Sequence, residues 1–314
     1  MFNFEHPEYF FWGAVVCSLF FVFDSPTSAA QNTTASVADA IEMSKENPYV
    51  SLELLANAVY VYDVKSEKPL FEKNGLQVLP LASVAKIMTA MTALSLIPDT
   101  TYITITERAI QEEGDSGLNA GERWLLRDLL KFLLVESSND GAVAVSSAVG
   151  AIVATSTSTK TEDEYRGMFI EEMNKLASSI GLASTHFQNE SGLDIDKESS
   201  GAESSAKETA RMLAYALLKF PGVFQETRWS ELVLQSEDGK PHPAENTNKE
   251  IGNFPLLIAS KTGYTDLAGG NLVLAFDAGF NNPIIISVLG STMDGRFTDA
   301  EQLVWATLAY LQQQ

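Results

Sequence analysis

The chain has 314 residues, of which 45% are hydrophobic and 20% charged, a balance typical of one large globular domain or two small ones. Acidic residues outnumber basic residues by 41 to 21, and the net charge of −20 argues against a nucleic-acid-binding protein, which needs a basic surface. The single cysteine, Cys17, excludes an intramolecular disulfide and a cysteine-rich metal site, and the three histidines lack ligand-like spacing, so we expect no metal or other cofactor.

The N-terminal segment carries an apolar run, residues 9–23, that is shorter than the roughly 20 residues of a membrane-spanning helix. It resembles the core of a signal peptide, and small residues at 28–30 offer a cleavage site before Gln31. The residues ahead of the run are acidic rather than basic, so an uncleaved membrane anchor is the alternative. We therefore expect a signal peptide or N-terminal membrane anchor over residues 1–30, a linker over 31–48, and one domain over 49–314.

The first half of that domain mixes strand and helix patterns. Residues 57–64 alternate like a strand, and 68–75 follow as the second strand of a hairpin. Pro80 precedes a helix predicted from about Ser83 to Leu96, and 101–106 is a short strand. Further helices are predicted at 124–134, 139–149, 163–180 and 205–219.

The second half is richer in strands and ends in a helix. Strands are predicted at 231–236, 256–263, 270–279 and 283–292, the last three adjacent and antiparallel. A final helix is predicted over 299–311, capped by Thr298 or Asp299. Strands at both ends with helices between them predict an α/β domain whose sheet is assembled from both termini around an inserted helical block.

Chemistry is suggested first by Ser83 and Lys86, which lie on one face of the predicted helix at spacing i and i+3. The residues after Lys86 are mostly apolar, and burial of an ammonium is costly unless it is paired or loses its proton. A desolvated lysine has a lowered pKa and can act as a base, which would activate a nearby serine without histidine.

The same S-x-x-K spacing occurs again at Ser204 and Lys207, and about one copy is expected by chance. This second copy is interpreted as structural. Ser205 and Glu208 form a capping-box pattern at the start of a helix, which would place Lys207 in a polar first turn.

Two further stretches distinguish the copies. Ser137 and Asn139 form an S-x-N pattern, which alone is more often a helix cap than a catalytic motif. Lys261, Thr262 and Gly263 end a strand-rich run and alone could be a surface turn. The order S-x-x-K, S-x-N, K-T-G is the motif set of penicillin-binding proteins and β-lactamases, and only Ser83 fits that order.

On these motifs the chain resembles the serine-type D-Ala-D-Ala carboxypeptidases, the low-molecular-mass penicillin-binding proteins. The resemblance runs from about Leu54 to the C-terminal helix and includes "LPLASVAKIMTA", "ESSNDGA" and "SKTGYTDLAGGNLVLAF". Glu190 departs from the family, which usually has proline at this position. The resemblance implies a β-lactamase/transpeptidase-like α/β fold, with an antiparallel sheet from both chain ends flanked by helices and an inserted helical subdomain.

The resemblance also implies roles for the motif residues. Ser83 would be the acyl-ester nucleophile and Lys86 its general base. Ser137 would relay a proton to the leaving amine, and Asn139 would orient the substrate amide.

The third motif would bind the end of the substrate. Lys261 and Thr262 would hold its terminal carboxylate, and Gly263 would let the strand approach it closely. The backbone N–H groups of Ser83 and Tyr264 would form the oxyanion hole.

The implied reaction is removal of the terminal D-Ala from peptidoglycan stem peptides, with β-lactam antibiotics as covalent inhibitors, in the cell envelope outside the cytoplasmic membrane. A peptidoglycan D,D-endopeptidase and a β-lactamase share the fold, although no E-x-x-x-N loop lies between Ser137 and Lys261. A Ser-His-Asp hydrolase would need His186 or His242, and neither accompanies a G-x-S-x-G motif. An inactive module that binds cell-wall peptide is a further alternative.

Overall fold

The computed structural model describes residues 47–154 and 160–314. The expected signal peptide or anchor and nearly all of the expected linker lie outside these residues. Within the described ranges, no helix is both long and apolar enough to cross a membrane.

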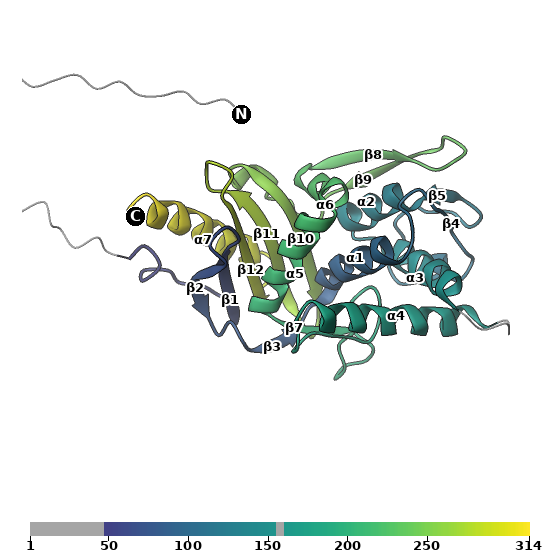
Figure 1. Ribbon diagram of the computed structural model, residues 1–314, viewed down its shortest axis with the longest axis horizontal. Coiled ribbons are helices and arrows are strands. Elements are labelled where there is room, and N and C mark those ends of the chain that lie inside the picture. Colours follow the sequence, from purple (N-terminus) through teal and green to yellow (C-terminus); the bar gives the residue numbers. More distant parts are fainter. Residues whose placement is uncertain (1–46, 155–159) are drawn as a thin grey trace, which may run out of the picture. The chain divides into compact units, whose positions relative to one another are not determined.

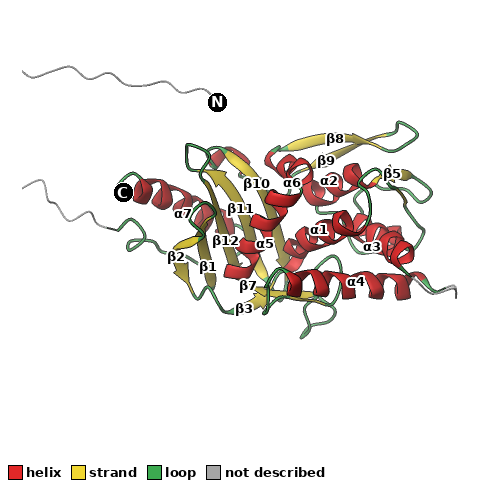
Figure 2. Cartoon of the chain, viewed as in Figure 1, coloured by secondary structure: helices red, strands yellow, loops and turns green. Residues whose placement is uncertain are grey.

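The largest sheet in the described residues has five strands in the order β10-β11-β12-β1-β2, and every neighbouring pair is antiparallel (Figures 1 and 2). β1 and β2 come from the start of the domain, and β10, β11 and β12 come from its end. The predicted sheet assembled from both chain ends is therefore confirmed. The five strands are β1 (Ala58–Asp63), β2 (Lys68–Lys73), β10 (Leu257–Thr265), β11 (Gly269–Asp277) and β12 (Pro283–Ser291).

Side chains alternate between the two faces of this sheet, and each face packs against its own helix. Ala58 and Tyr60 of β1 belong to the core that includes α5 (Ala206–Lys219). Val59 and Val61 belong to a second core that includes α7 (Gly295–Leu311). The sheet is thus buried between helices on both faces, which explains why its three C-terminal strands are almost continuously apolar.

The segment between β2 and β10 forms a helical region that packs against the α5 side of the sheet (Figure 1). Its helices are α1 (Lys86–Leu96), α2 (Leu126–Glu136), α3 (Asn139–Val153), α4 (Glu162–Ser179) and α6 (Pro221–Phe224). Its 3-10 turns are Ala82–Ala85, Ala109–Gln111, Gln225–Arg228 and Ile251–Asn253.

Short strands complete the domain in three small sheets. Their orders are β3-β7-β6, β4-β5 and β8-β9. The strands are β3 (Val78–Pro80), β4 (Tyr102–Thr104), β5 (Arg123–Leu125), β6 (His186–Phe187), β7 (Ala202–Ser205), β8 (Glu231–Gln235) and β9 (Pro241–Glu245).

Two predicted helix starts were wrong for local reasons. The segment from Ser83 begins as a 3-10 turn, and α-helical hydrogen bonding starts only at Lys86. The helix predicted from residue 124 starts at Leu126, because Arg123 to Leu125 pair with β4 as a strand.

The predicted cap of the last helix was also wrong. α7 begins at Gly295, where the Thr292 hydroxyl accepts the Gly295 N–H at 2.9 Å. Asp299 is 1% exposed and lies inside the helix, where it accepts hydrogen bonds from the backbone N–H groups of Leu55 and Ala56. Asp299 therefore ties the start of the domain to its last helix instead of capping that helix.

Candidate active site

Ser83 and Lys86 meet at the junction between the 3-10 turn and α1. The Lys86 Nζ atom lies 2.9 Å from the Ser83 Oγ atom. Lys86 is 0% exposed, whereas Ser83 is only partly buried. In this pair the serine is therefore accessible to a ligand, whereas the lysine is shielded from water.

Two oxygens besides that of Ser83 surround the Lys86 amino group. Its Nζ atom donates to Asn139 Oδ1 at 2.6 Å and to the Ser191 backbone carbonyl at 2.9 Å. Neither acceptor can donate a proton in return, whereas the Ser83 hydroxyl can. A neutral Lys86 would thus place its two N–H bonds on Asn139 and Ser191 and direct its lone pair at the hydroxyl of Ser83.

Burial is the largest influence on Lys86 and lowers its pKa to about 7. The carboxylates of Glu190, Asp140 and Glu112 oppose this effect, because they stabilise the protonated form. The amino group is therefore poised near neutral pH, where it can both accept and return a proton.

Ser137 and Asn139 lie in the short connection from α2 to α3. Ser137 follows α2 in the left-handed conformation, with φ of 64°, and Ser138 caps α3 by accepting the Gly141 N–H at 2.8 Å. A non-glycine residue at positive φ is strained, and such strain clusters at functional sites. The turn projects Ser137 toward Lys261, while Asn139 reaches Lys86.

Lys261 and Thr262 lie in β10, at the edge of the five-stranded sheet. The Lys261 Nζ atom donates to Ser137 Oγ at 2.9 Å, and both Lys261 and Thr262 are at most 3% exposed. Burial lowers the pKa of Lys261 well below its usual range, and the positive charges of Lys86 and Arg296 add to the effect. A bound anion at this position would stabilise the protonated form of Lys261 and so raise its pKa.

Gly263 is required by the close approach of β10 to the segment that carries Ser83. A Cβ atom at Gly263 would lie 2.6 Å from the Leu81 carbonyl oxygen and 3.2 Å from the Ser83 backbone nitrogen. Only glycine fits at such distances without displacement of backbone. The three motifs thus come together in one cluster, from three segments far apart in the sequence.

Three further residues touch this cluster and carry no motif that the sequence analysis singled out. Thr247 Oγ1 lies 2.6 Å from Thr262 Oγ1, Arg296 donates to the Gly263 carbonyl at 2.8 Å, and Ser191 contributes its carbonyl to Lys86. The hydroxyl of Thr247 reaches Thr262 from a different segment, and threonine alone does not indicate such a contact in the sequence. The contacts of Arg296 and Ser191 depend on backbone carbonyls, which leave no pattern of side-chain types.

The second S-x-x-K copy has the predicted structural role, with one difference. Ser205 caps α5 by accepting the Glu208 N–H at 3.2 Å. Glu208 does not complete a capping box, because its carboxylate accepts from the Ser184 N–H and from the Thr185 hydroxyl. Ser204 lies 2.7 Å from Thr185 and does not contact Lys207, which is partly exposed.

The histidines lie outside the cluster. His186 is exposed on β6. His242 is buried in β9, with Nε2 3.2 Å from the Glu122 carboxylate and its ring 4.8 Å from that of Trp124. Pro241 and Pro243 are tolerated beside it because a two-stranded ribbon needs few ladder hydrogen bonds. In the described part of the chain, no three His, Cys, Asp or Glu residues are grouped to hold a metal ion.

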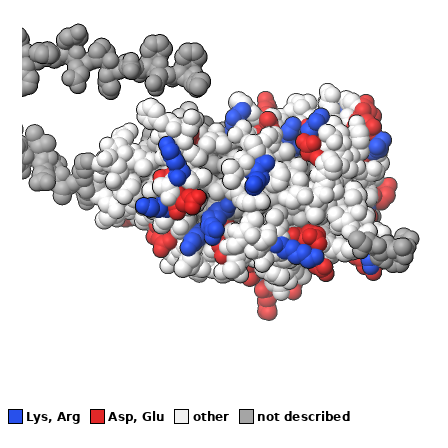
Figure 3. All heavy atoms as spheres, in the orientation of Figure 1, with Lys and Arg blue, Asp and Glu red and all other residues white. Residues whose placement is uncertain are grey.

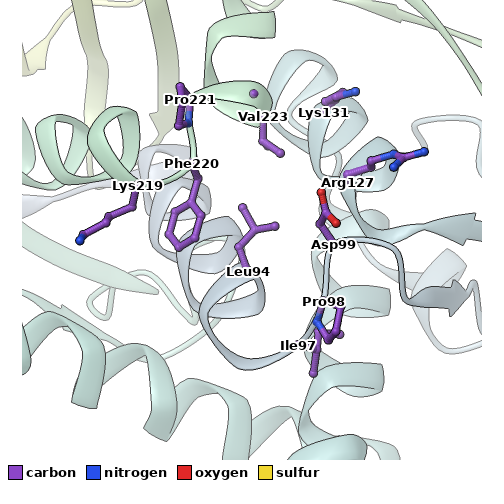
Figure 4. A pocket seen from close by; sticks show the side chains of 11 residues that line it. Leu94, Ile97, Pro98, Asp99, Arg127, Lys131, Lys219, Phe220, Pro221 and Val223 are labelled. Carbon is purple, nitrogen blue, oxygen red and sulfur yellow. The ribbon is translucent and has the colours of Figure 1, made fainter.

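The pocket shown in Figure 4 is separate from this cluster and lies at the opposite end of α1. Leu94 and Phe220 form part of its apolar wall, and Arg127, Lys131 and Lys219 lie around it. Figure 3 shows basic and acidic side chains interspersed over one face of the domain. The buried lysines of the cluster thus differ from the exposed bases, which share the surface with acidic residues.

Comparison with known proteins identifies the family of the chain. A family model for D-alanyl-D-alanine carboxypeptidases, peptidase S11, matches residues 41–293. The chain belongs to this family. Solved relatives match the chain with TM-scores of 0.69 and 0.65, so the predicted fold class is confirmed.

Individual relatives include peptidases with two named specificities. D-alanyl-D-alanine carboxypeptidase DacF of Bacillus subtilis is 29% identical over 217 residues, which cover 67% of this chain and 51% of the relative. D-alanyl-D-alanine endopeptidase of Haemophilus influenzae is 30% identical over 224 residues, which cover 70% of each chain. The chain thus spans about half the length of the first relative and more of the second.

A solved structure supplies a third comparison. Penicillin-binding protein D2 of Listeria monocytogenes, in its ampicillin-bound form, has a TM-score of 0.65 at 27% identity, covering 81% of this chain and 98% of that one. This solved penicillin-binding protein thus shares its fold with the chain.

Proposed function

We propose that the chain is a serine-type D-Ala-D-Ala carboxypeptidase that removes the terminal D-Ala from peptidoglycan stem peptides through an acyl-enzyme. The observation that carries the proposal is the contact of buried Lys86 with the reachable hydroxyl of Ser83, in a chain of the S11 family. Because this chemistry uses protein side chains alone, it needs no metal or organic cofactor.

In the first half of the reaction, neutral Lys86 takes the proton of the Ser83 hydroxyl while Oγ attacks the carbonyl carbon of the penultimate D-Ala. The developing oxyanion would be held by the backbone N–H groups of Ser83 and Tyr264. Collapse of the tetrahedral intermediate breaks the peptide C–N bond, and the leaving D-Ala amine takes a proton through Ser137. Water then hydrolyses the ester and restores the hydroxyl of Ser83.

The substrate would be positioned by the second and third motifs. Lys261 and Thr262 would hold the terminal carboxylate, and the Asn139 amide would orient the substrate amide. Support comes from the position of Lys261, whose Nζ atom lies 2.9 Å from Ser137 Oγ, so the carboxylate would dock next to the residue that protonates the leaving amine. Gly263 keeps β10 close to Ser83. Ser83 could therefore reach the scissile carbonyl while Lys261 binds the terminal carboxylate.

The proposal is tested by incubating the protein with a peptide that ends in D-Ala-D-Ala and measuring the released D-Ala. We expect release by the unmutated chain, unchanged by a chelator, and none above background by the Ser83→Ala variant. Retention of activity in the variant would refute the proposal.

The endopeptidase of Haemophilus influenzae, at 30% identity, supports a second candidate, cleavage of peptidoglycan cross-links by the same residues. Parallel assays on an uncross-linked stem peptide and a cross-linked dimer separate the two. We expect the stem peptide to react faster, whereas faster cleavage of the dimer would favour the endopeptidase.

Binding of β-lactams follows from the same nucleophile, and ampicillin-bound penicillin-binding protein D2 supports it by similarity. We propose covalent inhibition rather than rapid turnover, because no E-x-x-x-N loop, as class A β-lactamases have, lies between Ser137 and Lys261. Since peptidoglycan lies outside the cytoplasmic membrane, we also propose that the protein is exported through residues 1–30, either cleaved or retained as an anchor by residues 9–23.

A further inference from the structure

Glu190 is a buried carboxylate beside the active site that the reaction above does not use. Its side chain is 0% exposed, and its Oε1 atom accepts two bonds from Arg166, from Nε at 2.9 Å and from a terminal nitrogen at 2.8 Å. Its Oε2 atom has no hydrogen-bond partner among the described residues. A buried carboxylate with one unpaired oxygen is costly, so its presence calls for a compensating role.

The backbone around Glu190 lies along the segment that carries the nucleophile and base. The Glu190 carbonyl accepts from the Thr89 hydroxyl at 2.6 Å, and the next carbonyl, of Ser191, accepts from Lys86 Nζ at 2.9 Å. Gly192 follows so closely that a Cβ atom there would lie 1.9 Å from the Ala82 carbonyl oxygen. Residues 190–192 thus contact α1 and the preceding turn at three successive points, in reverse order of sequence.

Arg166 fixes this segment to the helical region. Its guanidinium, on α4, lies between Glu190 and Asp163, whose carboxylate is 2.9 Å away and 70% exposed. Glu112 lies 4.0 Å from the same guanidinium. Because two Arg166 nitrogens converge on Oε1 of Glu190, the carboxylate is held in its position in the segment that contacts Lys86.

The carboxylates that act on Lys86 come from three other segments: the loop of Glu190, the start of α3 and the loop of Glu112. Glu190, Asp140 and Glu112 stabilise the ammonium form, and Glu190 has the largest effect of the three. Lys261, on β10, opposes them, because the two ammonium groups repel each other when both are protonated. Removal of the Glu190 charge alone should therefore make the ammonium form of Lys86 less stable.

We propose, on the basis of the function proposed above, that Glu190 is a positioning residue for acylation, which anchors the Ser191 carbonyl against Lys86 and stabilises the ammonium formed there. When the Ser83 proton passes to Lys86 Nζ, the O–H bond breaks, an N–H bond forms and a positive charge appears on the nitrogen. The fixed negative charge of Glu190 stabilises that product of proton transfer, and Arg166 holds the carboxylate in place.

The test is the pH dependence of the second-order rate constant for acylation of the full chain by a fluorescent penicillin. In the Glu190→Gln variant, the rising limb of the pH–rate profile should shift to lower pH by about 1 unit, because the negative charge that stabilises the ammonium form of Lys86 is lost. The rate on the high-pH plateau should fall severalfold, because Lys86 becomes a weaker base. A limb that stays in place, or moves to higher pH, would overturn the proposal.

The matched control is Asp163→Asn, which removes one negative charge from the exposed side of the same arginine. We expect its pH limb to coincide with that of the unmutated chain, and an equal shift in both variants would show a general charge effect and overturn the proposal.

If Glu190→Gln does not fold, the double variant Arg166→Met, Glu190→Met decides, because replacement of both partners of a buried ion pair by apolar residues is often tolerated. Its limb should also move to lower pH, and an unmoved limb would refute the proposal. No acylation of the unmutated chain would instead refute the proposed function, and this inference with it.

Discussion

Lys86 and Asn139 are 53 positions apart in the sequence, yet the Lys86 Nζ atom lies 2.6 Å from Asn139 Oδ1. This contact joins the S-x-x-K and S-x-N motifs directly. Asn139 begins α3, and its Nδ2 atom donates to the Glu113 carbonyl at 2.7 Å, so the amide is held at both ends. The orientation of Lys86 toward Ser83 therefore depends on the start of a different helix.

The first prediction concerns the site of covalent labelling. A penicillin should add one stable adduct to the chain, on Ser83, because the hydroxyl of this serine contacts Lys86, the proposed general base. Intact mass followed by peptide mapping checks the position. The matched control is Ser205→Ala, which removes the helix cap of the second S-x-x-K copy and should leave labelling intact in folded protein. An adduct on residues 204–208 would contradict the assignment.

The second prediction concerns the end of the substrate. Lys261→Ala should raise KM strongly for a peptide with a free terminal carboxylate, since this cation is proposed to bind that group. The unmutated protein should already react poorly with the amidated peptide, which lacks the charge. Steady-state kinetics on both peptides check this, and an equal loss of activity on both after the substitution would point to a role for Lys261 other than carboxylate binding.

Much of the fold could be predicted because the signals are local. β10, β11 and β12 are apolar runs separated by tight turns, and both cores depend on simple alternation along β1. β9 could not be predicted, because its two prolines are typical of loops. The start of α7 was also missed, because the hydroxyl that accepts its first N–H belongs to Thr292, outside the helix.

The candidate site was predictable in its motif residues and not in their supports. Ser83, Lys86 and Lys261 were identified by residue type and order alone. The Ser191 carbonyl and the Arg166–Glu190 pair depend on how a loop and α4 pack against α1, which no spacing in the sequence encodes. The strained φ of Ser137 is likewise a consequence of tertiary structure rather than of local preference.

The third prediction is the pH dependence of the unmutated protein. Lys86 must be neutral to accept the Ser83 proton, and burial lowers its pKa to about 7. Acylation should therefore be slow in acid, rise through about pH 7 and then level off, because the fraction of neutral lysine increases with pH. The profile is checked by measuring the rate of penicillin acylation from about pH 5 to about pH 9, at intervals of roughly one pH unit. A rate that falls over this range would contradict Lys86 as the base.

The fourth prediction separates stability from catalysis and concerns Asp299. Its carboxylate is 1% exposed and accepts the Leu55 and Ala56 N–H groups at 2.9 and 2.8 Å and the Ser291 hydroxyl at 2.7 Å. Asp299→Ala should lower the free energy of unfolding by about 2–4 kcal/mol, since it leaves the buried N–H of Ala56 unpaired and removes bonds to a charged acceptor. Chemical denaturation of the two proteins measures the difference.

Asp299→Asn should recover part of that loss, because the amide oxygen can still accept one of the two backbone bonds. Glu301→Ala is the matched control: it removes a partly exposed carboxylate from the same helix and should change the free energy of unfolding by less than about 0.5 kcal/mol. All three variants should keep the acylation rate of the unmutated protein at 25 °C, because Asp299 contacts no residue of the active-site cluster. If Asp299→Ala were as stable as Glu301→Ala, the link between the start of the domain and α7 would contribute nothing to the stability of the fold.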